Sequence, residues 1–211
     1  MQAPSTSIDE VIANELLEQR VPRVRSESAE AHAMDELKRA LAGSPRGVLQ
    51  KLVEVALHLC NAQSAGLSLL EEADGQRFFR WHAVAGAWGP LLWATLPRGL
   101  SPCGTTLDRG EALLMVDPER YFAPLAQVPP RVTEVLLVPF SVRGETVGTV
   151  WVVAHDPAQQ FDREDRRVVR ELTVFAAAAY QRLLSFRPED IRELTRMHLV
   201  SEPRAGDADG V

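Results

Sequence analysis

Residues 100–122 read Leu100-Ser-Pro-Cys-Gly-Thr-Thr-Leu-Asp-Arg-Gly-Glu-Ala-Leu-Leu-Met-Val-Asp-Pro-Glu-Arg-Tyr-Phe122 and carry the signals for a helix start, a helix end and a short strand. Ser101 can cap a helix that begins at Pro102, because a serine side chain accepts hydrogen bonds from free N–H groups and proline suits the first turn. Gly110 would end that helix, and residues 112–116 then form a short strand. A loop, a helix and a strand are therefore predicted in succession.

Strand hairpins are predicted on both sides of this span. Residues 64–70 alternate apolar and small side chains, and Asp74-Gly75 makes a turn into a second strand over 77–85. In that second strand one face should carry Phe79, Trp81 and Ala83, and the other Phe78, Arg80, His82 and Val84. Residues 133–142 and 145–155 form a second hairpin around Arg143-Gly144.

Helices are predicted before and after the strands. Ser44 caps a helix over 45–60 whose apolar stripe includes Cys60, and Cys60 should pack in the core. Asp162 caps the last long helix, with Asp165 in the place of the usual Glu or Gln. Shorter helices are expected over 8–20, outside the main fold, and over 31–41 and 189–198; residues 201–211 lack the apolar content to fold.

This order of elements is typical of an α+β fold with an antiparallel sheet, because the turns between neighbouring strands are too short for parallel crossovers. Two further segments strengthen the pattern of the opening stretch. They are Gly-Thr-Val-Trp-Val-Val-Ala-His-Asp at 148–156 and Phe-Asp-Arg-Glu-Asp at 161–165. With them, the chain resembles a GAF domain of the kind joined to bacterial sensor histidine kinases, here standing alone.

The resemblance implies a sheet of five or six antiparallel strands, with helices on one face and a loop-helix pocket on the other. It divides the chain into an N-terminal helical extension at 1–43, a GAF domain at 44–186, and a short helix with a disordered tail at 187–211. A sensory GAF domain binds a small ligand in such a pocket. The candidate ligand-binding residues are Trp81, Trp88, Trp93, Cys103, Thr105, Thr106, Tyr121 and Phe122.

Cys103 is also a redox candidate. It lies in the first turn of a predicted helix, where free N–H groups and the helix dipole stabilise a thiolate. The alternative is that Cys103 is a small packing residue beside the pocket. The sequence leaves both interpretations open.

Three ligand or reaction classes known among GAF domains can be compared with these residues. Attachment cysteines for bilins are typically followed by histidine, whereas Gly104 follows Cys103. Free methionine sulfoxide reductases carry a similar Cys-Gly-Thr, but their other cysteines have no counterpart here. The cyclic-nucleotide signature matches only at Phe161 and Asp165. The ligand or cofactor is therefore unknown, and a bilin and a cyclic nucleotide are both disfavoured.

Composition excludes several other classes. The 211 residues carry a formal charge of −6, which disfavours nucleic acid and anionic membranes as partners. No apolar run reaches the roughly 20 residues of a membrane span, and the acidic N-terminus is unlike a secretory signal, so a cytoplasmic location is expected. The two cysteines and five scattered histidines offer no metal-ligand spacing, so no metal is assigned.

The sequence therefore favours a non-catalytic sensory domain that binds a small molecule and passes a signal to a partner protein in trans. The helical ends and the alanines at 176–179 are expected to form a homodimer. Two alternatives stay open. One is a thiol-dependent redox enzyme or sensor centred on Cys103, similar to methionine sulfoxide reductase, and the other is a dimerisation module without a ligand.

Overall fold

The computed structural model describes residues 7–185 and has the predicted α+β architecture. Six strands form one antiparallel sheet in the order β3-β2-β1-β6-β5-β4. Their bounds are β1 Ser64–Ala73, β2 Gln76–Gly86, β3 Thr95–Pro97, β4 Leu113–Val116, β5 Glu134–Val142 and β6 Glu145–Ala154. The three-residue β3 pairs with β2 and has no counterpart in the sequence prediction.

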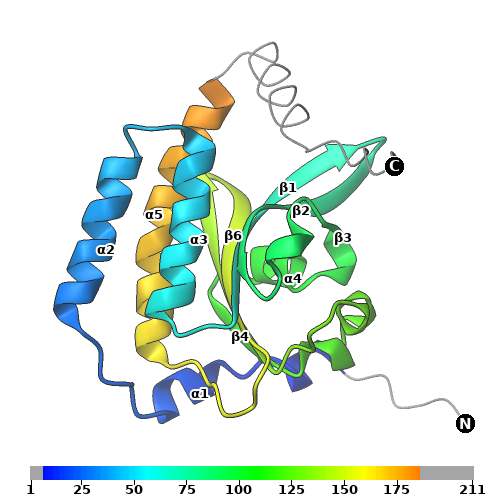
Figure 1. Cartoon of the computed structure of the whole chain (residues 1–211). Coiled ribbons are helices and arrows are strands. Elements are labelled where there is room, and N and C mark those ends of the chain that lie inside the picture. The colour runs from blue at the N-terminus through cyan, green and yellow to red at the C-terminus, as the bar shows by residue number, and fades with distance from the viewer. Residues whose placement is uncertain (1–6, 186–211) are drawn as a thin grey trace, which may run out of the picture.

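Helices cover the two faces of the sheet unequally. The helices α2 (Glu27–Ala40), α3 (Pro45–Leu59) and α5 (Arg163–Ser185) form a layer on one face, while the short α4 (Pro102–Arg109) lies on the other with the loops around it (Figure 1). This is the arrangement that the resemblance implied. The second helix begins at Glu27, before the predicted start, because Ser26 caps it by accepting from the Ala29 N–H.

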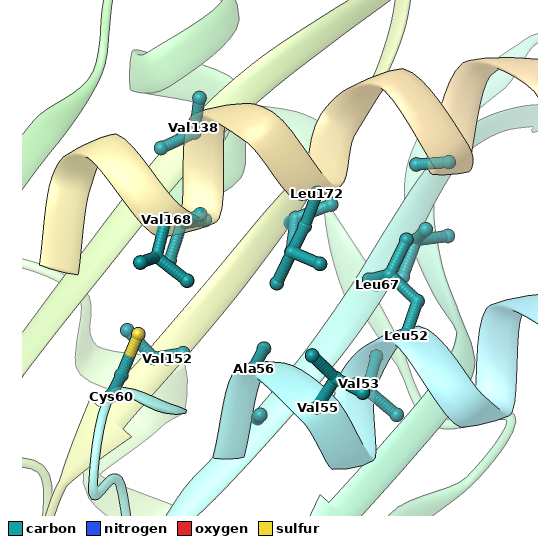
Figure 2. Packing of buried hydrophobic residues seen from close by; sticks show 14 of the residues in the cluster. Leu52, Val53, Val55, Ala56, Cys60, Leu67, Val138, Val152, Val168 and Leu172 are labelled. Carbon is teal, nitrogen blue, oxygen red and sulfur yellow. The ribbon is translucent and has the colours of Figure 1, made fainter. Parts of the chain in front are cut away.

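The core between the sheet and the helix layer is aliphatic. Figure 2 shows Leu52 and Ala56 of α3 facing the side of α5 that carries Val168 and Leu172, and all four side chains are fully buried. Cys60 follows α3 and is also fully buried in this cluster, so its predicted packing role is confirmed. The apolar stripes of the two long helices therefore build one core with the sheet.

The other face of the sheet carries a second, more aromatic cluster. Alternate residues of β6 divide between the faces: Val150 and Val152 belong to the aliphatic core, and Trp151 and Val153 to the aromatic cluster. The strand β5 divides in the same way. Both faces are buried, so these strands read as continuous apolar runs in the sequence.

A β-bulge in β2 corrects the predicted face assignment. Ser68 of β1 pairs with Trp81 and Leu67 pairs with Ala83, so His82 has no partner across the ladder. One extra residue exchanges the faces of everything that follows it. Ala83 therefore joins the aliphatic core and Val84 the aromatic cluster, opposite to the expectation from strict alternation.

The helix α4 and its ends follow the sequence prediction. The Ser101 side chain accepts from the Cys103 N–H, and Gly110 ends the helix in the left-handed conformation at φ 67°. At Gly104 an added Cβ would lie 2.0 Å from the backbone oxygen of Arg98. Glycine at this position lets the helix lie directly on the preceding loop.

The N-terminal segment belongs to the main fold, contrary to the expectation of a helix outside it. Residues Ile8–Glu10 form a 3₁₀ turn, and only Asn14–Gln19 form the α-helix α1. Between them the backbone pairs with the free edge of β4 through the Ala13 N–H to Leu114 O and the Val116 N–H to Val11 O. Val11 and Leu17 are fully buried. We call residues 7–26 the strap.

Three arginines fasten the end of the strap to buried carboxylates. Arg20 donates to both oxygens of Glu134, at 2.9 and 2.6 Å. Arg23 and Arg25 both bind Asp165, which is fully buried and also accepts from the Asp162 N–H at 2.9 Å. Asp162 in turn caps α5, so the predicted capping pair is confirmed and has a second role in holding the strap.

Two predictions, the helix over 189–198 and the unfolded tail at 201–211, lie outside the described residues. Within residues 7–185, no helix is both long and apolar enough to cross a bilayer.

Candidate functional site

A small cavity lies between the sheet and α4, inside the aromatic cluster. Its volume is about 30 Å³. Strands β2, β3, β5 and β6, the start of α4 and the neighbouring loops contribute the walls. The lining residues are Trp81, Trp88, Leu96, Ser101, Pro102, Cys103, Leu125, Val132, Val135, Leu137, Trp151 and Val153. None of them carries a charge.

Three tryptophans dominate this cavity. Trp81 and Trp88 stack with ring centroids 5.3 Å apart and planes 18° from parallel, and Trp151 lies tilted against both at 5.2 and 5.8 Å. Each of the three is only 3% exposed. Tilted and stacked rings of this kind are attractive beyond the area that they bury. The cluster forms an aromatic wall of the cavity.

Trp151 depends on a glycine in the neighbouring strand. Gly66 faces Trp151 across the β1–β6 ladder, and an added Cβ on Gly66 would lie 2.1 Å from the indole ring. The Trp151 Nε1–H donates to Ser68 Oγ at 2.8 Å, so its polar atom is satisfied inside the protein. The absent side chain at Gly66 and the hydroxyl of Ser68 together define where the ring lies.

Cys103 lies at the cavity as a buried thiol. Thr149 Oγ1 donates to Cys103 Sγ at 3.2 Å. Burial raises the pKa of Cys103, and the hydrogen bonds from Thr149, Ser101 and Ser68 oppose that rise only in part. The loss of solvation therefore opposes the thiolate stabilisation that the helix start would give, which favours the packing interpretation of Cys103.

Two polar side chains, Ser64 and His155, lie against Trp88. Its backbone N–H donates to Ser64 Oγ at 3.1 Å, and His155 Nε2 lies 2.8 Å from the same oxygen. The His155 ring is 5.2 Å from the Trp88 ring. The Trp88 Nε1–H is buried, and no atom of residues 7–185 accepts a hydrogen bond from it.

The sequence candidates divide into three groups in the structure. Trp81, Trp88 and Cys103 line the cavity. Phe122 and Thr106 are buried close by, and the Thr106 hydroxyl donates to Pro102 O within its own helix. The remaining three do not line it: Thr105 is half-buried, Tyr121 is 44% exposed, and Trp93 is 40% exposed with its ring against His82.

Sequence reasoning missed the lining residues of β5 and β6, above all Trp151. Strand alternation places Trp151 on the same face as Val153, but which face meets the pocket depends on the register between β1 and β6. The sequence signal that could have found Trp151 was the combination of Gly66 and Trp151, because a glycine in one strand leaves room for a large ring on a neighbouring strand. Val135 and Leu137 of β5 gave no comparable signal, because β5 is apolar on both faces.

Other kinds of site find little support in the described part of the chain. Between residues 7 and 185, no three His, Cys, Asp or Glu side chains come together as metal ligands would. Cys60 belongs to the aliphatic core and Cys103 to the aromatic cluster, on opposite faces of the sheet. The two thiols therefore do not meet in this fold.

Comparison of structures shows the same fold in several proteins. The GAF domain of an Acinetobacter phosphoenolpyruvate-protein phosphotransferase is 15% identical with a TM-score of 0.62 over 76% of this chain and 95% of its own. A free methionine-R-sulfoxide reductase from Neisseria meningitidis, solved with its substrate, is 16% identical with a TM-score of 0.56 over 77% and 95%. Part of a methyl-accepting chemotaxis protein is 16% identical with a TM-score of 0.58 over 74% and 99%.

Sequence comparison gives the family directly. No curated protein matches the chain significantly. The family model of the GAF domain matches residues 42–181, which is most of the chain and spans α3, the whole sheet and most of α5. The cavity described above lies within that range. The chain belongs to the GAF domain family.

Proposed function

We propose that this GAF domain is a sensor that binds a small molecule in the cavity beside α4 and passes the binding event to a partner protein. The observation that carries the proposal is the cavity itself. It combines an aromatic wall with the unpaired N–H of Trp88, on the face of the sheet opposite α3 and α5. A buried apolar site with a few convergent polar groups is the default place for a ligand.

The strap supplies a route from the cavity to the helix layer. Ile8 and Ile12 pack against the aromatic cluster, while Leu16 and Leu17 pack in the aliphatic core. The strap also pairs with β4, whose Leu113 and Met115 belong to the aromatic cluster. A displacement of the cavity wall would therefore reach the helices through one continuous segment.

The helix layer is where we place the contact with a second copy and with the partner. Val174 and Leu184 on α5 are 68% and 52% exposed, and no described part of the chain covers them. Ala176 and Ala179 are fully buried in the aliphatic core, so they do not contribute to this face. Ala178 is half-buried one turn after Val174, and its small side chain would allow another helix to approach there. The homodimer and the partner contact are parts of this proposal.

Thermal shift measurements with a metabolite library, joined to native mass spectrometry of protein purified from its own host, test the sensor function. We expect a bound molecule in the native spectrum and a raised melting temperature with that molecule. Val135→Phe, which enlarges a lining side chain, should abolish the shift, and Val174→Phe on the exposed face of α5 should keep it. A shift that survives Val135→Phe would place binding elsewhere, and no ligand at all would favour a module that only dimerises.

The second candidate function is thiol chemistry at Cys103. It is favoured by the position of Cys103 at the cavity and by the fold shared with the methionine-R-sulfoxide reductase. The buried thiol with a raised pKa and the distance of Cys60 across the sheet oppose it. An assay of free methionine sulfoxide reduction with the wild type and Cys103→Ser decides. Turnover that Cys103→Ser removes would establish the enzyme, and no turnover by the wild type would exclude it.

A further inference from the structure

We propose that the cavity takes an uncharged, largely apolar molecule that accepts one hydrogen bond from the Trp88 indole N–H. This inference rests on the proposed function, because it names the chemical class of the ligand at the same site. Three independent features of the cavity support it. They are the absence of charge in its lining, the start of α4, where the backbone N–H groups are already hydrogen-bonded, and the unpaired indole nitrogen of Trp88.

The lining has no charged side chain that could balance the charge of a bound ion. All twelve lining side chains are uncharged, and the walls consist of indole rings and aliphatic groups with Ser101 and Cys103 as the polar exceptions. Transfer of an ion into such surroundings is far more costly than transfer of a neutral group, unless a counter-charge is present. A charged ligand would therefore have to leave water without a partner.

The start of α4 offers no anion site either. Helix starts commonly bind anions through free backbone N–H groups. Here Pro102 has no N–H, the Cys103 N–H donates to Ser101 Oγ, and the Gly104 and Thr105 N–H groups donate to Ser101 O. The residue that caps the helix thus occupies the donors that a carboxylate or phosphate would need.

The unpaired nitrogen of Trp88 indicates that the ligand carries a hydrogen-bond acceptor. A buried donor without an acceptor costs about 1–3 kcal/mol, which an acceptor on a bound molecule would recover. Its neighbour Trp151 has its nitrogen satisfied by Ser68. The other buried side-chain nitrogens without a partner in residues 7–185 belong to the guanidinium groups of Arg23, Arg25 and Arg98, outside the cavity. Among the cavity tryptophans in residues 7–185, Trp88 is therefore the one whose indole nitrogen is both fully buried and without an acceptor.

The small size of the cavity means that a ligand larger than a water molecule can enter only if the protein moves. A volume of about 30 Å³ is room for about one water molecule. A ring-sized molecule therefore enters only when Trp88 and the segment after it move outward. Binding then changes the surroundings of the Trp88 indole, which makes its N–H signal a direct reporter.

Four probes of nearly equal shape separate charge from hydrogen bonding. Acetophenone is neutral and has a carbonyl acceptor, α-methylstyrene is neutral without one, benzoate is an anion and benzamidinium is a cation. Titrations followed by the indole ¹H–¹⁵N signals measure the binding of each to the full chain. We expect acetophenone to bind about 2- to 10-fold more tightly than α-methylstyrene. Both should bind at least about tenfold more tightly than either ion.

A matched pair of variants assigns the hydrogen bond. Trp88→Phe keeps an aromatic ring and removes the N–H, so the preference for acetophenone over α-methylstyrene should disappear. Trp93→Phe removes an indole outside the cavity lining and should keep that preference. Wild-type affinities for the four probes decide the question of charge even if a variant does not fold.

Two results would overturn the inference in distinguishable ways. Equal or tighter binding of benzoate or benzamidinium at the cavity signals would contradict the uncharged class and leave the sensor function standing. If none of the four probes moves the cavity indole signals, the ligand class proposed here is wrong. The sensor function fails as well only if the metabolite library and native mass spectrometry also yield no ligand.

Discussion

At the scale of single residues, the candidate site depends on a glycine and a tryptophan that face each other across two strands. Gly66 leaves the space that the Trp151 ring occupies, and Ser68 accepts from its nitrogen. A methyl group on Gly66 would collide with the ring at 2.1 Å. The ring cannot move without disturbing the stacked Trp81 and Trp88.

Gly66→Ala should therefore destabilise the protein and alter the cavity. Overpacking of a buried site typically costs about 1–3 kcal/mol in the free energy of unfolding. Urea unfolding followed by tryptophan fluorescence measures this loss and the changed environment of the cluster. Gly99→Ala is the matched control, because nothing lies within 4 Å of its added Cβ. Equal stability of the two variants would contradict the close approach of Trp151.

Cys103 yields a second prediction at this scale. Burial raises the pKa of the thiol, and only the thiolate reacts with disulfide reagents. In the folded protein at pH 7.5, we expect Cys103 to react with 5,5′-dithiobis(2-nitrobenzoate) at least about tenfold more slowly than in denaturant. Cys60→Ser isolates the signal of Cys103. Rapid labelling of the folded Cys60→Ser variant would revive the redox interpretation.

At the level of helices and strands, the strap differs most from the sequence prediction, which was a helix outside the main fold. The Asn14 side chain donates to Ala112 O at 3.1 Å and accepts from the Leu114 N–H at 2.7 Å. One amide thus continues the ladder that the strap backbone forms with β4. The strap closes a sheet edge that would otherwise present free backbone groups.

Asn14→Ala should loosen the strap from β4. It leaves two backbone groups of the β4 edge without partners, at a cost of about 1–3 kcal/mol in the free energy of unfolding. Hydrogen exchange of the Leu114 amide should accelerate as well. Gln19→Ala, an exposed amide on the same helix, is the control and should change stability by less than about 0.5 kcal/mol. Unchanged exchange at Leu114 in Asn14→Ala would contradict the pairing.

The other end of the strap rests on a buried ion pair. The Arg20 and Glu134 side chains are only 16% and 6% exposed, and Glu134 also accepts from the Phe161 N–H. Arg20→Met should destabilise the protein by about 3–5 kcal/mol, because it leaves a buried carboxylate without its cation. Arg170→Met on the exposed side of α5 is the control in urea unfolding. A loss no larger than that of the control would show that the strap is not fastened there.

At the scale of the whole molecule, two histidines make stability depend on pH. Burial lowers the pKa of His82, with Arg80 and Arg46 adding to the effect and Glu71 opposing it. Burial also lowers the pKa of His155. Both therefore bind a proton more readily in the unfolded chain, so unfolding takes up protons and stability falls as the pH drops below about 6.5.

The melting temperature should consequently decrease between pH 7.5 and pH 5.5. Replacing both histidines, as His82→Gln with His155→Gln, should make that decrease smaller, because two sources of proton uptake are gone. Calorimetry at a series of pH values compares the double variant with the wild type. The same decrease in both proteins would refute the proposed origin of the pH dependence.

The proposed homodimer is also a property of the whole molecule. Val174→Glu with Leu184→Glu should weaken self-association, because each places a charge on the exposed apolar face of α5. Leu100→Glu, 54% exposed beside α4, is the matched control. Light scattering over a range of concentrations measures the change. A dimer that resists both α5 substitutions would place the interface elsewhere.

The order of the long helices and strands, the ends of α3, α4 and α5, and the antiparallel sheet could be predicted from the sequence, because local caps, turns and apolar spacing act over a few residues. The sequence also predicted three of the residues that line the cavity, namely Trp81, Trp88 and Cys103. The cavity lining from β5 and β6, the bulge at His82 and the docking of the strap were decided only by the tertiary structure. Each depends on strand register or on contacts between distant segments, such as Arg20 with Glu134. The sequence likewise left two interpretations of Cys103 open, because the solvation of a thiol is set by what packs around it and cannot be read from its neighbours in sequence.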